Sequence, residues 1–217
     1  MTIGSVRSRI LAAADRSGRD PGTVRLIAVS KEQSPEAVMR VYDQGHRDFG
    51  ESRAQELAQK IGLLPEDIRW HFVGRLQRNK VRLVRPSVVL LHSMDRMSLG
   101  EAWVKGPGLP PPVLMQVNVG MEPQKGGVPP EDAAGTLARL RSMGLRVRGL
   151  MGIPPPGSQD TARRYFRELA ELRLRLAVDE PDLVELSMGM TDDFEAAIAE
   201  GSTMVRVGRA IFGPRKG

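Results

Sequence analysis

Short apolar runs alternate regularly with longer, helix-length segments along the chain, and this alternation limits the possible folds. Eight runs rich in apolar and β-branched residues have the length of strands, and a longer segment separates each from the next. Strands joined by helical crossovers lie parallel in a sheet, so the pattern predicts an α/β protein. The predicted strands are residues 24–29, 47–49, 69–73, 87–91, 113–119, 146–151, 183–187 and 203–207.

The remaining segments have the periodicity of amphipathic helices. Eight strand–helix units in 217 residues favour a single (β/α)8 barrel of the TIM type with an extra N-terminal helix, and a doubly wound open sheet is the alternative. No change in composition marks a second domain, so residues 1–217 are expected to form one domain. The predicted helices are residues 3–16, 35–44, 52–61, 79–84, 96–105, 131–143, 159–178 and 192–199.

Residue types and segments that the sequence lacks exclude several classes of protein. Without cysteine there is no disulfide framework, thiolate metal site or cysteine nucleophile, and a reducing compartment is favoured. No run of about 18 apolar residues predicts a membrane span, and the N-terminus lacks the apolar core of a secretory signal. A cytoplasmic protein is therefore expected. His46, His71 and His92 lack the spacing of metal ligands, so no metal site is predicted.

The charge of the chain is positive, with a formal net charge of +6 and a pI of about 10.1. Its basic residues are spread along the whole sequence, and aromatic residues make up 4%, too few for a platform on which bases stack. No specific nucleic-acid partner is expected. Nucleic-acid binding stays a hypothesis that rests on charge alone. The chain has only six lysines, so a lysine in an apolar setting is informative.

Lys31 is such a lysine, since it lies two residues beyond the first predicted strand. Ligands of parallel α/β folds bind at the carboxyl ends of the strands. Partial burial there is expected to lower the pKa of the amine, and a neutral amine condenses with an aldehyde to a Schiff base. The alternative is a structural lysine that caps a turn or pairs with Glu32.

Glycine-rich segments follow the last two predicted strands, at residues 187–192 and 208–213. Barrels of this type often bind phosphate in these two loops, where glycine lets backbone N–H groups approach an anion. Ser187 and Gly208 fall in these two loops, although glycine after a strand usually serves only to form a turn. A lysine after the first strand and a phosphate site after the last two together indicate an aldehyde-phosphate cofactor, a description that fits pyridoxal 5′-phosphate.

At this level of detail the chain closely resembles the pyridoxal-phosphate homeostasis protein family. Eight segments carry the resemblance in the same order as in the family, through nearly the whole chain. They are residues 26–31 (LIAVSK), 49–56 (FGESRAQE), 70–80 (WHFVGRLQRNK), 116–126 (QVNVGMEPQKG), 148–151 (RGLM), 186–193 (LSMGMTDD), 196–201 and 205–213 (VRVGRAIFG).

The resemblance implies a barrel like the N-terminal domain of alanine racemase, as in fold-type III pyridoxal-phosphate proteins. It places the Schiff base on Lys31 and an arginine, Arg206, against the pyridine nitrogen. The phosphate falls to Ser187, Met188, Gly208 and Arg209, while Asn118 and Lys125 border the mouth. Met151, Met188 and Met190 lie at the ends of predicted strands, and from this position they are expected to line the pocket.

One residue departs from the pattern of the family. Many relatives have Gly-Glu-Asn where this chain has Gly-Glu-Ser, with the serine at position 52. The asparagine amide can reach an oxygen of the cofactor ring. Ser52 is shorter and has a single donor, so its contact is expected to be weaker or bridged by water.

The resemblance implies a protein that holds pyridoxal phosphate reversibly and carries or buffers it, without a settled catalytic reaction. Such a protein affects vitamin B6 and the balance of amino acids and keto acids, and its recipients would be pyridoxal-phosphate-dependent apoenzymes. A monomer is expected. The alternative is an amino-acid racemase, which needs a second base besides Lys31. The two tyrosines, Tyr42 and Tyr165, fall in predicted helices, so the sequence offers no second base.

Overall fold

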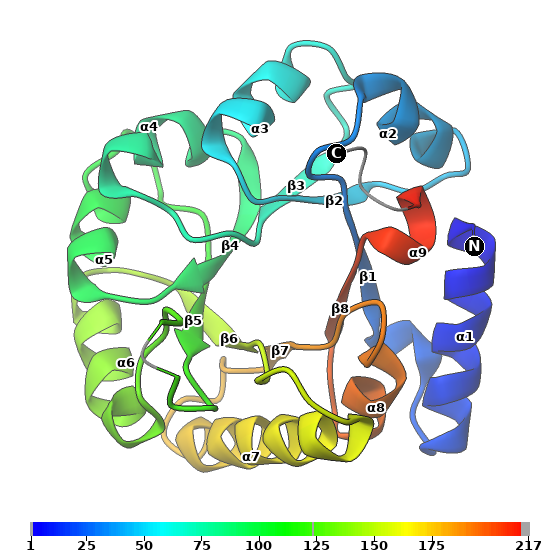
Figure 1. Cartoon of the computed structure of the whole chain (residues 1–217). Helices are drawn as coiled ribbons and strands as arrows, with labels where there is room; N and C mark the ends of the chain where they lie inside the picture. Colours follow the sequence, from blue (N-terminus) through cyan, green and yellow to red (C-terminus); the bar gives the residue numbers. More distant parts are fainter. Residues whose placement is uncertain (1, 123, 214–217) are drawn as a thin grey trace.

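The computed structural model describes residues 2–122 and 124–213 and contains a closed barrel of eight parallel strands in sequential order (Figure 1). β1 pairs with β8 and closes the barrel, with Leu26 opposite Val205. The predicted TIM-type barrel is confirmed, whereas residues 1, 123 and 214–217 of the expected domain lie outside the described part of the chain. The strands are β1 (Arg25–Val29), β2 (Asp48–Glu51), β3 (Arg69–Phe72), β4 (Val88–Met94), β5 (Val113–Val117), β6 (Val147–Gly152), β7 (Glu185–Ser187) and β8 (Met204–Val207).

Helices surround the ring of strands on the outside (Figure 1). They are α1 (Ile3–Arg16), α2 (Pro35–Tyr42), α3 (Ala54–Ile61), α4 (Val81–Val84), α5 (Met97–Val104), α6 (Ala133–Ser142), α7 (Gln159–Ala177), α8 (Phe194–Ala199) and α9 (Arg209–Phe212). Short 3₁₀ turns cover Pro21–Thr23, Arg78–Lys80 and Pro130–Asp132. No helix of the described residues combines the length and the apolar character needed to cross a lipid bilayer.

Polar residues at the starts of helices explain several boundaries. Ser34 accepts a hydrogen bond from the N–H of Ala37 at the start of α2, and Ser158 accepts one from Thr161 at the start of α7. Thr2 forms a capping box with Ser5 at the start of α1. This helix stands outside the strand–helix repeat, as predicted, and packs against α8 and α9.

The structure differs from the predicted boundaries where turns compete with the apolar pattern. β5 ends at Val117 instead of residue 119, because the chain turns at Asn118, whose carbonyl oxygen accepts from the N–H of Met121 (3.0 Å). β7 begins at Glu185 instead of residue 183, because Leu183 is held in a turn by the carbonyl oxygen of Glu180. The helix α9 was not predicted, because four residues are too few to show a periodicity.

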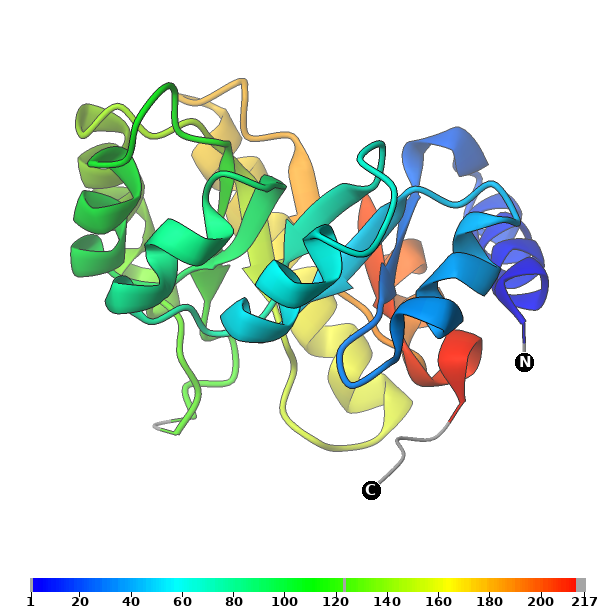
Figure 2. The same ribbon diagram turned by 90° about the horizontal axis from the view of Figure 1, so that it is seen from above.

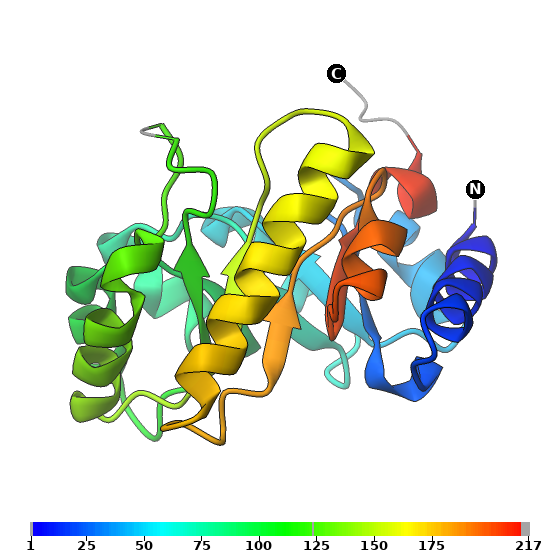
Figure 3. The same cartoon turned by 90° about the horizontal axis from the view of Figure 1, so that it is seen from below.

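Two apolar layers form the core of the protein. The larger one fills the space between the strands and the helices. The smaller one lies inside the barrel and consists of Ile27, Leu90, Leu114, Met151 and Met204. The interior is therefore packed, and a ligand has room only at an end of the barrel. The loops after β5 and β6 and the helix α9 rise at the same end, where the strands have their carboxyl ends (Figures 2 and 3).

Candidate functional site

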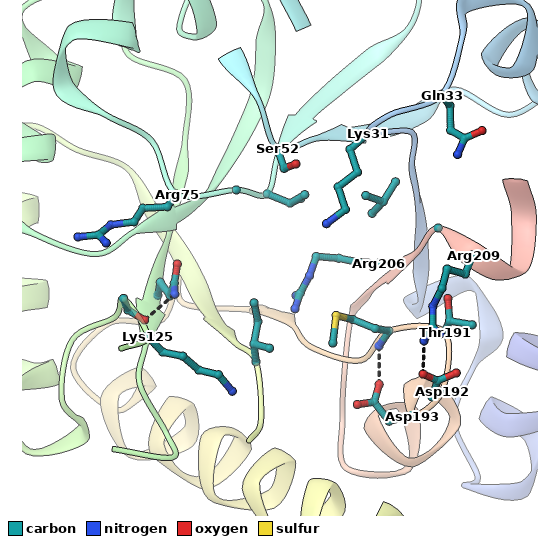
Figure 4. Close-up of a pocket in the computed structure, with 18 of the residues that line it drawn as sticks. Lys31, Gln33, Ser52, Arg75, Lys125, Thr191, Asp192, Asp193, Arg206 and Arg209 are labelled. Atoms are coloured by element: carbon teal, nitrogen blue, oxygen red, sulfur yellow. Dashed lines mark hydrogen bonds and ion pairs between the residues drawn. The ribbon is translucent and has the colours of Figure 1, made fainter. Parts of the chain in front are cut away.

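A cavity of about 810 Å³ opens at the carboxyl ends of the strands. Lys31, Ser52, Arg206 and Arg209 lie around this space (Figure 4). The structure thus brings together, from separate strands, most of the residues predicted from the sequence. Those that line the cavity are Lys31, Ser52, Asn118, Lys125, Met190, Arg206, Gly208 and Arg209.

Lys31 follows β1 and extends its partly buried side chain into the cavity (Figure 4). A buried ammonium group holds the backbone immediately before it. Lys60 of α3 is 3% exposed, and its Nζ donates to the carbonyl oxygen of Ser30 (2.6 Å) and to Oε1 of Glu51 (2.6 Å). The hydroxyl of Ser30 donates to the same oxygen of Glu51 (2.7 Å). Lys60 and Glu51 therefore fix the position from which the Lys31 side chain starts.

The residue after Lys31 is held as well. The N–H of Glu32 donates to Oε1 of Glu56 (2.6 Å), which also pairs with Lys60 (2.7 Å). Glu32 has a φ of 61°, a left-handed conformation that is uncommon for residues other than glycine. Burial raises the pKa of Glu51 against the opposing charge of Lys60. This cluster was not predicted, because pairing between a strand end and a helix face leaves no local signal in the sequence.

Arg206 is a buried cation at the floor of the cavity. It is 5% exposed, and none of the carboxylates in residues 2–122 and 124–213 forms an ion pair with it. Its Nη1 donates to the hydroxyl of Ser187 (2.6 Å) and its Nη2 to the carbonyl oxygen of Gly152 (3.1 Å). Burial lowers the pKa of Arg206 to about 10, and the charge of Asp193 opposes this shift, so the guanidinium stays protonated at neutral pH. Such a group favours a ligand atom that accepts a hydrogen bond.

The loop after β7 brings a hydroxyl to the cavity that the sequence analysis did not assign. Gly189 has a φ of 92°, and a side chain there would meet the backbone of Phe194, so the turn requires glycine. Beyond it the N–H of Met190 donates to the carboxylate of Asp193 (2.6 Å), and Thr191 lines the cavity. Burial raises the pKa of Asp193. The sequence did contain a signal for Thr191, because it is a second hydroxyl residue in the segment 187–192 and follows Gly189.

The loop after β8 supplies backbone donors on the same side of the cavity. Gly208 precedes α9, and the first N–H groups of a helix, here those of Arg209 and Ala210, have no partner within the helix. The guanidinium of Arg209 forms an ion pair with Asp192, which also lines the cavity (Figure 4). The charge of Arg209 is thereby partly compensated, and the backbone N–H groups, together with the hydroxyl of Thr191, are donors for an anion.

Three of the predicted residues do not line the cavity. Ser187 is fully buried inside the barrel, where its hydroxyl contacts Arg206 and His92. Met188 packs into the core between strands and helices, and Met151 belongs to the cluster inside the barrel. Met190, in contrast, lines the cavity as expected. Contacts of Ser187, Met188 and Met151 with a ligand therefore stay predictions.

Asn118 and Lys125 lie at the mouth, as expected, and both interact within their own loop. The amide of Asn118 donates to the carbonyl oxygen of Glu122 (2.9 Å). Lys125 pairs with the carboxylate of Glu122 (2.5 Å) and donates to the carbonyl oxygen of Pro154 (3.0 Å). These contacts give the mouth a defined shape.

Ser52 packs tightly against the neighbouring strand end. A side chain on Gly74, which follows β3, would place its Cβ 2.4 Å from the carbonyl oxygen of Ser52 and 2.7 Å from its Cα. Only glycine allows this approach, because backbone atoms cannot turn away as a flexible side chain can. The close contact holds Ser52 at the edge of the cavity.

Replacement of Gly74 by alanine is expected to lower the free energy of unfolding by about 1–3 kcal/mol, because the new methyl group overpacks two strand ends. Urea denaturation measures the change. Gly135→Ala is the matched control, since position 135 stands in α6 and a methyl group there would meet no neighbouring side chain within 4 Å. This control is expected to raise the free energy of unfolding by about 0.5–1 kcal/mol. Equal effects of the two variants would contradict the packing argument.

Known proteins resemble this chain over nearly its whole length. A family model described as the alanine racemase N-terminal domain matches residues 3–216. The pyridoxal phosphate homeostasis protein of Aquifex aeolicus is 42% identical over 221 residues, which cover 99% of this chain and 97% of that protein. The protein of the same name from Escherichia coli is 41% identical over 228 residues, covering 98% of this chain and 95% of that protein.

Solved structures show the same relationship. PipY of Synechococcus elongatus, solved with PLP bound, is 34% identical with a TM-score of 0.80 and covers 96% of this chain and 100% of its own. The alanine racemase of Corynebacterium glutamicum is 15% identical with a TM-score of 0.68, covering 100% of this chain and 63% of its own, and so shares the fold alone. On its sequence and its barrel, the chain belongs to the pyridoxal phosphate homeostasis protein family.

Proposed function

We propose that this protein binds pyridoxal 5′-phosphate as a Schiff base on Lys31 and takes part in the homeostasis of the cofactor by carrying or buffering it. The observation that supports the proposal most strongly is the composition of one cavity. It combines an amine at Lys31, a buried cation at Arg206 and the first backbone N–H groups of α9, at Arg209 and Ala210. These groups complement an aldehyde, a pyridine nitrogen and a phosphate. The PLP-bound PipY structure and the names of the relatives support the same ligand.

Pyridoxal phosphate, when bound, supplies an aldehyde that reacts with amines and a ring that withdraws electrons from the attached carbon. Lys31 is proposed to form a C=N bond through its Nζ, with release of water. Arg206 carries only donors, so it keeps the ring nitrogen unprotonated and weakens the ring as an electron acceptor. The residues around the cofactor therefore favour binding of the cofactor and disfavour reactions that pass through a carbanion.

Thr191 and the first N–H groups of α9 are proposed to bind the phosphate, since they border the same side of the cavity. Replacement of Thr191 by valine keeps its shape and removes one hydrogen bond to a charged group, about 1.5–3 kcal/mol. The Kd for pyridoxal phosphate is expected to rise about 10- to 100-fold in a spectrophotometric titration. Thr191→Ser retains the hydroxyl and should bind with nearly unchanged affinity. An unchanged Kd in the valine variant would remove Thr191 from the phosphate site.

A racemase is the second candidate, because the fold is shared with alanine racemase. Racemisation needs bases on both faces of the substrate, and neither tyrosine supplies the second one. The hydroxyl of Tyr42 in α2 donates to Asp67 (2.7 Å), and Tyr165 lies in α7 against the core, so both stand on the outside of the barrel. We therefore propose that the protein is not an enzyme. We also propose that it acts as a monomer and passes the cofactor to pyridoxal-phosphate-dependent apoenzymes.

A transfer assay tests this function. The loaded protein is mixed with a pyridoxal-phosphate-dependent apoenzyme, and the recovery of that enzyme's activity is followed alongside assays for racemase and transaminase activity. Recovery without turnover of amino acids is the expected result. Turnover of an amino acid by the loaded protein, lost in the Lys31→Ala variant, would favour the racemase instead.

A further inference from the structure

A continuous chain of polar side chains crosses the interior of the barrel. Asp48 at the start of β2 contacts His71 of β3 through Oδ1 and Nε2 (3.2 Å). Nδ1 of His71 lies 2.9 Å from Nε2 of His92 in β4, and Nδ1 of His92 lies 2.8 Å from the hydroxyl of Ser187 in β7. That hydroxyl accepts from Arg206 (2.6 Å). All five side chains belong to buried residues, and the chain ends at the cofactor cavity.

The carboxylate of Asp48 and the single proton on each buried imidazole fix the direction of every hydrogen bond in this chain. Asp48 is an acceptor, because Arg69 and His71 together hold the pKa of its carboxyl well below the usual range against the effect of burial, so Nε2 of His71 carries the proton and donates to it. Nδ1 of His71 then accepts from the Nε2–H of His92, and Nδ1 of His92 accepts from the hydroxyl of Ser187. Arg206 can only donate, and the oxygen of Ser187 accepts from it with a lone pair.

Both histidines are neutral in this arrangement. Burial lowers the pKa of His71 and lowers that of His92 well below its ordinary value, and the chain needs one proton on each ring. A second proton on either ring would put a donor against a donor. The geometry and the burial thus agree on one protonation state, in which each imidazole is the Nε2–H tautomer.

We propose that His71, His92 and Ser187 are positioning residues for Arg206 and form a one-directional hydrogen-bond relay that aims its guanidinium at the ring nitrogen of the cofactor. Without the relay, the guanidinium of Arg206 would keep, among the described residues, its bond to the carbonyl oxygen of Gly152. The inference rests on the proposed function for its cofactor end, whereas the relay itself belongs to the protein alone.

The relay gives Ser187 a role that differs from the phosphate contact predicted for it. Its hydroxyl accepts from Arg206 and donates to His92, so both of these capacities are used within the barrel. Removal of a phosphate ligand would change the affinity for inorganic phosphate. Removal of a relay residue would leave that affinity unchanged and alter only the surroundings of the ring.

The first test uses the cofactor-free protein, so it is independent of the proposed function. Long-range proton–nitrogen NMR correlation of isotope-labelled histidine at neutral pH reports the tautomer of each ring. Both His71 and His92 are expected as neutral Nε2–H tautomers, with assignment by His71→Gln and His92→Gln. A proton on Nδ1, or a doubly protonated ring, at either position would overturn the relay.

The second test uses the protein loaded with pyridoxal phosphate. Ser187→Ala is expected to shift the absorption maximum of the Schiff base and to leave competition by inorganic phosphate unchanged, while Ser187→Thr restores the wild-type band. His46→Gln is the control, a buried histidine that contacts the backbone oxygen of Asp48 and stands outside the relay. An unshifted band in Ser187→Ala, or an equal shift in the His46 variant, would overturn the positioning role. If the wild-type protein forms no Schiff base at all, the proposed function fails, and the NMR result still decides the relay.

Discussion

The Lys31→Ala variant is expected to lose the visible absorption band of bound pyridoxal phosphate completely. Lys31 is the amine that the end of β1 directs into the cavity, and alanine removes it without adding volume (Figure 4). Absorption spectra of the two proteins, recorded with added pyridoxal phosphate and again after borohydride, measure the effect. The wild type should show a band that borohydride abolishes, and the variant should show only the spectrum of the free cofactor.

Two lysine variants control this experiment. Lys105→Ala changes an exposed lysine at the end of α5 and is expected to leave the band intact. Lys125→Ala changes the lysine at the mouth of the cavity, which is paired with Glu122. If Lys125→Ala abolished the band and Lys31→Ala kept it, the anchor would be the mouth lysine and the assignment of Lys31 would be wrong.

Replacement of Lys60 by methionine is expected to lower the free energy of unfolding by about 3–5 kcal/mol, because it leaves the carboxylate of Glu51 buried without its partner. Chemical denaturation measures this loss. The same variant is expected to form the Schiff base more slowly, since Lys60 also holds the carbonyl oxygen of Ser30 next to Lys31. Rates of band formation after mixing with pyridoxal phosphate measure this second effect.

A double variant that combines Lys60→Met with Glu51→Gln tests whether these two side chains act as a pair. Once the glutamate is neutral, loss of Lys60 leaves no unpaired charge at position 51, so the double variant should regain part of the lost stability. Lys105→Met is the surface control, with an expected change within about 0.5 kcal/mol. Additive losses in the double variant would show that Lys60 and Glu51 do not act as a pair.

The barrel was predictable because its signal is local. Runs such as residues 24–29 and 203–207 have the length and β-branched content of buried strands, and the structure contains β1 and β8 there. The boundaries shifted where a turn satisfied backbone groups before the apolar run ended, as at Asn118. Alternation of strand and helix thus determines the architecture, and hydrogen bonding in the turns decides the last residues of each element.

The site was predictable only in part, since side-chain direction depends on the register of each strand. Lys31, Arg206 and Gly208 line the cavity because the predicted strand ends were placed within a residue or two. Ser187 is the last residue of β7 and points into the barrel, so the loop beyond Gly189 presents Thr191 instead. The contacts of Lys60 with Glu51 join a helix to a strand end, and no pattern along the chain reveals them.

Peptide mapping of the reduced complex identifies the lysine that holds the cofactor covalently, which we propose is Lys31. The wild-type protein is loaded with pyridoxal phosphate, reduced with borohydride and digested, and mass spectrometry locates the added phosphopyridoxyl group. We expect this group on the peptide that contains Lys31 and nearly none on peptides that contain Lys60, Lys80, Lys105 or Lys125. A label mainly on another lysine, or no label on a protein that binds the cofactor, would contradict this assignment.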